Sequence, residues 1–328
     1  MLQFFKKQAA LTLFAVLFLA AAGAAQKSDK DKKTDKEPAT GTPVLWQGGS
    51  VANRDLFSGP GGDSMKPDLS NITFIERDTN GHQKKYRIKD GSGHVWVAKL
   101  GREARPETAA VRLLYGLGYE TEINYLVPEI TIPTVGTVKN VRLEARPDGV
   151  KRLDQWSWKQ NPFVGSNELQ GLKIMQVFLT NYDLLDMQNK VLKVKGPNGT
   201  ELHYIISDLG STFGRFGNNN LPIFFRLGRA TNNPKAWNKA KFIKGVKNGH
   251  IQFATTGMKS RSLVKDITVE QGRWLFDRLS QLSDAQIRDA YRAANFSPAE
   301  IDLLMAGTKR RIEELDRATS DRLAKNKK

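Results

Sequence analysis

The chain of 328 residues contains no cysteine. This absence excludes disulfide bonds, thiolate zinc sites, iron–sulfur clusters and cysteine nucleophiles. The sequence is also poor in histidine, and its four histidines lack the spacing of zinc ligands: His82, His94, His203 and His250. Charged residues make up 26% of the chain and hydrophobic residues 39%, which predicts a folded protein with a substantial core.

Acidic residues are missing from one long segment, Leu209 to Lys265, although the whole chain has 34 of them. The same segment contains eleven Lys and Arg residues, so much of the net charge of +17 is concentrated there. We call residues 209–265 the basic segment. A cationic surface attracts anionic substrates or polymers and raises their encounter rate. We expect anion docking at Arg226, Arg229, Lys235, Lys239, Lys241 and Lys244, with Trp237, Phe242 and Phe253 interleaved among them.

The chain lacks a hydrophobic run long enough for a membrane span, which needs roughly 20 residues. The apolar stretch from Ala9 to Ala22 follows Lys6 and Lys7 and ends in small residues. This pattern predicts a secretory signal peptide over residues 1–25, with an uncleaved membrane anchor as the alternative. Residues 26–43 alternate Lys and Asp without an aliphatic run, which predicts a disordered charged linker.

These features predict an exported protein, periplasmic in a bacterium or otherwise secreted. Clustered Lys and aromatic residues also occur in nucleic-acid-binding proteins. Export disfavours nucleic acid as the partner and favours an anionic substrate or envelope polymer. We expect membrane contact only through an uncleaved signal or through electrostatic attraction to the surface. The oligomeric state is left open.

Residues 44–150 are predicted to be rich in strands, and residues 151–328 mainly helical. Alternating apolar and polar residues predict strands at 71–75, 86–89, 94–99, 125–132 and 138–144. A helix is expected after Pro106, between the third and fourth of these strands. The helical pattern starts at about Trp156 and is densely apolar from Leu169 to Leu179. A hairpin at 191–206 and three capping boxes follow, at Thr268/Gln271, Ser283/Gln286 and Ser297/Glu300.

Four charged residues occur in an order that suits phosphoryl transfer. Lys99 ends an apolar strand, and Glu107 lies at the start of the next helix. Asp183 follows a buried helix and precedes two amides, Gln188 and Asn189, while Asp208 closes a strand and is followed by Leu-Gly. Phosphoryl transfer requires a lysine on the phosphates, a glutamate that positions it, magnesium ligands and a base near the acceptor.

The segments Val97-Ala-Lys99, Pro106-Glu107, Asn181-Tyr-Asp183 to Asn189 and Ser207-Asp-Leu-Gly210 resemble the protein-kinase-like superfamily. The similarity is to its divergent branches, namely HipA-type, lipid and secreted Golgi-type kinases. It implies an α+β, two-lobed protein-kinase-like fold with a small antiparallel-sheet N-lobe, one helix in that lobe, and a mainly helical C-lobe. It further implies that ATP or another nucleoside triphosphate binds with Mg or Mn.

By this resemblance Lys99 and Glu107 would serve nucleotide binding, Asp183 would be the catalytic base, and Asp208 with Gln188 or Asn189 would hold the metal. Asp186 is an alternative base, and Glu103 an alternative partner of Lys99. The sequence departs from the family in the turn Asp78–Gln83, which has one glycine where a glycine-rich loop is usual.

The resulting hypothesis is an exported phosphotransferase that acts on an acidic or envelope-associated acceptor. The alternative is a catalytically inactive kinase-like module that binds anionic polymer or lipid through the basic segment. A third hypothesis is a metal-dependent hydrolase that uses Asp183 and Asp208. The sequence does not identify the acceptor or the nucleotide.

Overall fold

The structure, a computed structural model, describes residues 40–79, 83–217 and 228–325. The predicted signal peptide, most of the predicted linker, Arg226 and part of the turn 78–83 therefore lie outside the described residues. In the described ranges, no helix combines the length and the apolar character that a membrane crossing requires.

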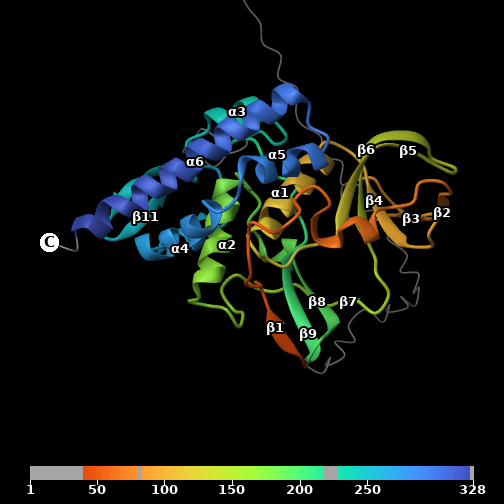
Figure 1. The fold of residues 1–328 in the computed structure, drawn as a ribbon, viewed down its shortest axis with the longest axis horizontal. Helices are drawn as coiled ribbons and strands as arrows, with labels where there is room; N and C mark the ends of the chain where they lie inside the picture. The colour runs from red at the N-terminus through yellow and green to blue at the C-terminus, as the bar shows by residue number, and fades with distance from the viewer. Residues whose placement is uncertain (1–39, 80–82, 218–227, 326–328) are drawn as a thin grey trace, which may run out of the picture. The chain divides into compact units, whose positions relative to one another are not determined.

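Five strands form an antiparallel sheet in the order β2-β3-β4-β6-β5 (Figure 1). Their bounds are β2 Thr73–Asp78, β3 Lys85–Lys89, β4 Val95–Lys99, β5 Asn124–Ile132 and β6 Gly136–Ala145. Alternation along the strands buries one set of side chains in a small core that includes Ile88, Trp96 and Leu143. One helix, α1 (Ala104–Gly116), follows β4 and packs against β5 and β6. The predicted N-terminal sheet with one helix is confirmed.

A second sheet has the order β1-β9-β8-β7. Its bounds are β1 Thr42–Val44, β7 Lys151–Arg152, β8 Asn189–Gly196 and β9 Gly199–Ile206. Strands β8 and β9 form the predicted hairpin, and Gly196 pairs with Gly199 at its turn. Strand β1 pairs in parallel with β9, so the last two residues of the predicted linker, Thr42 and Pro43, already belong to a strand.

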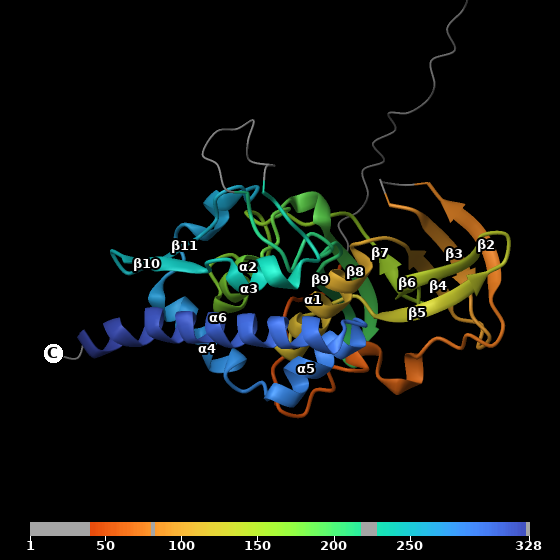
Figure 2. The same ribbon diagram turned by 90° about the horizontal axis from the view of Figure 1, so that it is seen from above.

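The remaining part is mainly helical, as predicted. Its helices are α2 Asn167–Phe178, α3 Pro234–Lys239, α4 Val269–Leu279, α5 Asp284–Ala293 and α6 Pro298–Lys325. It also contains the hairpin of β10 (Ile243–Lys247) and β11 (His250–Phe253), which the sequence did not predict. The short 3-10 helices are η1 Gly59–Gly61, η2 Asp63–Met65, η3 Asp186–Gln188 and η5 Arg261–Val264. Helix α6 runs along α3, α4 and α5 and contacts all three (Figure 2).

The larger core joins the helices to α1 and to the second sheet. Leu45, Val51 and Leu56 belong to this core, so the stretch around β1 packs with the helical part and not with the five-stranded sheet. The N-terminal caps explain where helices start. All three predicted capping boxes are formed, because in each the cap side chain and the side chain three residues later bond each other's backbone N–H.

The predicted start of one helix is wrong. The helix expected from about Trp156 begins only at Asn167, because Ser166 caps it by accepting a hydrogen bond from the Leu169 N–H at 3.1 Å. Trp156 instead packs edge-on against Trp158 in the core. The aromatic residues interleaved in the basic segment are also core residues, since the side chains of Trp237, Phe242 and Phe253 are buried.

Candidate active site

One cavity, of about 310 Å³, collects the residues that the sequence assigns to phosphoryl transfer. It lies where the end of β4, the start of α1, the loop after α2 and the stretch after β9 meet. Its lining includes Lys99, Glu103, Glu107, Asp183, Gln188 and Asp208, together with Gln83, Lys85 and Ser211. Residues that are more than a hundred positions apart in the sequence therefore line one cavity.

Lys99 is held in this cavity by two carboxylates. Its Nζ lies 3.5 Å from Glu107 Oε1 and 3.4 Å from Glu144 Oε2. Arg142 contacts the same two glutamates, with its Nε 3.0 Å from Glu107 Oε2. The pairing of β4 with β6 explains this arrangement, because Lys99 is opposite Arg142, and Glu144 is two residues further on the same face. The four side chains form a buried charge network.

The two glutamates of the network have opposite pKa shifts. Burial raises the pKa of Glu107 to about 7, although Arg142 and Lys99 oppose this effect. Burial alone would also raise the pKa of Glu144. Four neighbouring cations instead hold the pKa of that carboxyl well below its ordinary value: Lys99, Arg142, Arg146 and Arg152. Burial and Arg142 would lower the pKa of Lys99, but Glu107, Glu144 and Asp208 raise it above its ordinary value. Lys99 is therefore a fixed cation at neutral pH.

Asp183 has a partner on each carboxylate oxygen. Gln188 Nε2 donates to Oδ2 at 3.0 Å, and Lys259 Nζ lies 2.6 Å from Oδ1. Lys259 belongs to the basic segment and reaches Asp183 across 76 positions of sequence. Sequence patterns alone did not assign a role to Lys259, Arg142 or Glu144. For Arg142 and Glu144 a signal existed, because charged residues two apart in a strand lie on one face.

Asp208 lies at the exit of β9. Its Oδ1 accepts a hydrogen bond from the Gly210 N–H at 3.1 Å, which fixes the turn into the following segment. A side chain at position 210 would lie 2.7 Å from Glu103 Cβ, so glycine permits this close approach of α1. Burial and the nearby Asp208 raise the pKa of Glu103.

The structure separates the alternatives that the sequence left open. Glu107, not Glu103, forms an ion pair with Lys99. Asp186 lies outside the cavity lining, and its Oδ1 accepts a hydrogen bond from the Trp158 N–H at 3.0 Å. Asn189 is buried, donates to the Trp156 carbonyl at 3.0 Å and does not line the cavity. Of the two candidate amides, Gln188 is the one that faces Asp183.

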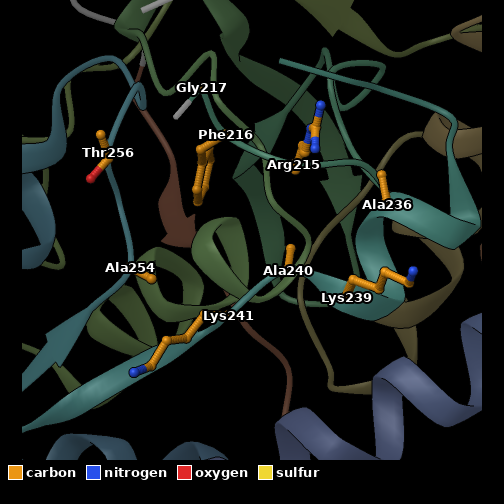
Figure 3. Close-up of a pocket in the computed structure, with 9 residues that line it drawn as sticks. All are labelled: Arg215, Phe216, Gly217, Ala236, Lys239, Ala240, Lys241, Ala254 and Thr256. Carbon is orange, nitrogen blue, oxygen red and sulfur yellow. The ribbon is translucent and has the colours of Figure 1, made fainter. Parts of the chain in front are cut away.

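The expected anion-docking residues do not form a single cluster. Lys235 and Lys244 are exposed, on α3 and β10. Lys239 and Lys241 line a second cavity, of about 360 Å³, together with Arg215. Figure 3 shows that their side chains extend in opposite directions and that Arg215 points away from both. Arg229 is half-buried near Asp183, in a third cavity.

The donor set in the first cavity fits a magnesium ion held jointly with a substrate. Asp208 supplies a carboxylate, and the amide oxygen of Gln188 receives no hydrogen bond from the described residues. Mg²⁺ in such sites takes one or two carboxylates and completes its coordination with phosphate oxygens and water. Within residues 40–79, 83–217 and 228–325, no group of three or more His, Asp or Glu side chains could hold a metal.

The sheet order, the single helix with its Lys–Glu pair, and the two aspartates on either side of a hairpin define a two-lobed, protein-kinase-like fold. No protein-family model and no curated protein matches the chain. Solved structures that resemble it include three kinases.

One is the Helicobacter pylori proinflammatory kinase CtkA, at 13% identity and a TM-score of 0.48, with 77% of this chain and 97% of that chain covered. Another is the Rio2 kinase of Chaetomium thermophilum with ADP, Mg²⁺ and phosphoaspartate, at 12% identity and a TM-score of 0.28, with 74% and 71% covered. The Golgi casein kinase matches at 10% identity and a TM-score of 0.30, with 75% of each chain covered. Because the identities and TM-scores are this low, the fold is described from the strand order and the cavity of this chain and not from its similarity to these structures.

Proposed function

We propose that the chain is a phosphotransferase that moves the terminal phosphoryl group of a nucleoside triphosphate to a hydroxyl of an acidic or envelope-associated acceptor. The observation that carries this proposal is the convergence of Lys99, Glu107, Asp183, Gln188 and Asp208 on one cavity. This inventory matches the needs of phosphoryl transfer, in which the protein mainly positions the reactants and stabilises charge.

Each residue has a defined role in the proposed reaction. Lys99, held by Glu107 and Glu144, would bind phosphate oxygens of the nucleotide. The acceptor oxygen forms a bond to the terminal phosphorus while the bond to the bridging oxygen breaks, and a nucleoside diphosphate leaves. Asp183 would accept the proton of the acceptor hydroxyl. Asp208 and Gln188 would hold Mg²⁺ or Mn²⁺, which would supply positive charge to the phosphates.

Two features support an anionic acceptor and an extracytoplasmic location. Lys259 contacts Asp183 directly, and Arg229 and Arg261 line the adjoining cavity with it, so three cations lie on the acceptor side. The N-terminal 25 residues have the basic, apolar and small-residue pattern of a signal peptide. Sequencing the N-terminus of the mature protein tests whether the signal peptide is removed.

The direct test is transfer of label from the terminal phosphate of a nucleotide, with Mg²⁺ or Mn²⁺, to the protein itself or to acidic acceptors. We expect Asp183→Asn and Asp208→Asn each to lower the rate at least a hundredfold. Asp186→Asn is the matched control, because Asp186 lies in the same loop but outside the cavity lining. Absence of transfer by the wild type, with salt-dependent binding of anionic polymer that Asp208→Asn leaves unchanged, would instead favour the non-catalytic module.

A further inference from the structure

A small cavity next to Asp183 is lined predominantly by cations. Its volume is about 270 Å³, and it is lined by Arg229, Gly257, Met258, Lys259 and Arg261. Three of these five residues are positively charged and none is negatively charged. They come from the stretch before α3, from the stretch between β11 and η5, and from the first residue of η5. We call this cavity the cationic pocket.

A hydrogen bond, an ion pair and a cation–π contact join the cationic pocket to the loop that carries Asp183. The Lys259 N–H donates to the Tyr182 carbonyl at 2.9 Å, and Lys259 Nζ reaches Asp183 Oδ1 at 2.6 Å. Arg229 stacks on the Tyr182 ring, with its guanidinium carbon 4.2 Å from the ring centroid, and donates to the Gly257 carbonyl at 2.6 Å. The positions of these two cations are therefore fixed relative to Asp183.

The pocket also has donors that lack acceptors. Arg229 Nε is buried and has no hydrogen-bond partner among the described residues. Arg261 is exposed and forms no ion pair with any residue whose placement is described. The Arg261 guanidinium lines the pocket and is exposed, so its N–H groups are open to an anion. Arginine N–H groups bind phosphate oxygens through charge-assisted hydrogen bonds.

We propose that the cationic pocket binds a phosphate-monoester group that the acceptor already carries, and so brings the acceptor hydroxyl next to Asp183. The inference rests on the proposed phosphotransferase function, because that function supplies the role of Asp183. A phosphate monoester matches the pocket in charge, since its two negative charges would meet three cations. The lysines that line the cavity of Figure 3 point apart and provide no comparable convergence.

Lys259 links acceptor binding to whether the Oδ1 atom of Asp183 is ion-paired or free. In the structure both oxygens of Asp183 are occupied, Oδ1 by Lys259 and Oδ2 by Gln188. A phosphate group in the pocket competes with Asp183 for Lys259, because both are anions within reach of the same ammonium group. Oδ1 is then free to accept the proton of the acceptor hydroxyl. Lys259 thus favours proton transfer when an anionic acceptor is in place.

The test is calorimetric titration of the full chain with O-phosphoserine and with glucose 6-phosphate, each compared with its unphosphorylated form. We expect saturable binding of at least one phosphorylated compound, and the preferred one identifies the source of the phosphate. Arg261→Ala should weaken this binding at least tenfold. Lys265→Ala should change it less than twofold, because Lys265 is also an exposed cation, four positions away, and does not line the pocket.

Two results would overturn the inference: no preference for the phosphorylated compounds, or equal affinity in wild type and Arg261→Ala. The outcome is separable from that of the proposed function. Asp208→Asn should retain phosphate-monoester binding while it loses nucleotide-dependent transfer. If the pocket binds as expected and the wild type transfers no phosphoryl group, the proposed function alone fails. If transfer occurs and Arg261→Ala leaves both affinity and KM unchanged, the pocket inference alone fails.

Discussion

Glu144 is the anion that holds the buried charge network together. It is 1% exposed and contacts Lys99, Arg142, Arg146 and Arg152. A buried ion pair gains stability only if its partners remain matched, because each charge has lost its hydration. Glu107 alone would leave these cations undercompensated, since burial raises its pKa to about 7. Glu144 therefore acts with Glu107 to keep Lys99 charged and in position.

Replacement of Glu144 tests this role. Glu144→Gln leaves four cations without their shared anion, so we expect a loss of about 3 kcal/mol in the free energy of unfolding, the range for a broken buried pair. Glu76→Gln is the matched control, because Glu76 pairs with Arg87 on an exposed strand position and should cost less than about 1 kcal/mol. Urea unfolding measures both. Equal losses in the free energy of unfolding for Glu144→Gln and Glu76→Gln would contradict the role of Glu144 in the buried charge network.

His203 makes stability depend on pH. Its Nδ1 lies 2.8 Å from Glu120 Oε2 and its Nε2 lies 2.8 Å from Glu201 Oε2. Burial would lower the pKa of His203, but the two glutamates raise it above its ordinary value. A raised pKa means that the folded protein binds the proton more tightly, so the stabilisation is complete below about pH 6.5 and is lost as the pH rises through the folded pKa.

The expected result is a stability difference between wild type and His203→Gln that shrinks with pH. At pH 6 the substitution should cost roughly 1.5 kcal/mol, as expected for hydrogen bonds of a charged group, and at pH 9 clearly less. Urea unfolding at the two pH values measures the difference. A cost that is the same at both pH values would show that His203 acts through packing and not through its charge.

At the level of elements, the local signals for helix ends were reliable, whereas contacts between distant elements were not predictable. The strand spacing, the helix after Pro106 and the three capping boxes are local patterns, and the structure contains all of them. The pairing of β4 with β6 brings Arg142 opposite Lys99, and no local pattern encodes which strands become neighbours. Trp237 and Phe242 illustrate the same limit, because alternation with lysines suits either a core or a surface.

Helix α5 shows how a cap can also join distant segments. Gln286 completes the capping box with Ser283, and its Nε2 donates to the Val51 carbonyl at 2.9 Å and to the Arg54 carbonyl at 3.0 Å. The start of α5 therefore fixes the stretch that follows β1.

We expect Ser283→Ala to lower the free energy of unfolding by about 1 kcal/mol, the usual cost of a lost N-cap. Ser262→Ala should have almost no effect, because Ser262 is exposed and caps no helix. Thermal and urea unfolding of the two variants measure this. Equal stability of Ser283→Ala and wild type would mean that Gln286 alone stabilises the N-terminal end of α5.

At the level of the whole molecule, the cations of the basic segment lie at several separate sites. The lysines Lys235 and Lys244 on α3 and β10 are exposed, while Lys259 contacts Asp183 and Arg229 stacks on the neighbouring Tyr182. The four charged residues that the sequence groups all line one cavity. Lys259 could not be selected, because it is one of eleven cations in the basic segment and lies 76 positions from Asp183.

The central claim is that the cavity of Lys99, Glu107, Asp183 and Asp208 is a site for a metal–nucleotide complex. Calorimetric titration with a non-hydrolysable nucleoside triphosphate, with and without Mg²⁺, tests it most directly in wild type and Asp208→Asn. The account predicts binding by the wild type that Mg²⁺ strengthens at least tenfold, and loss of this strengthening in Asp208→Asn. No nucleotide binding by the folded wild type, or binding that is indifferent to both Mg²⁺ and Asp208, would contradict it.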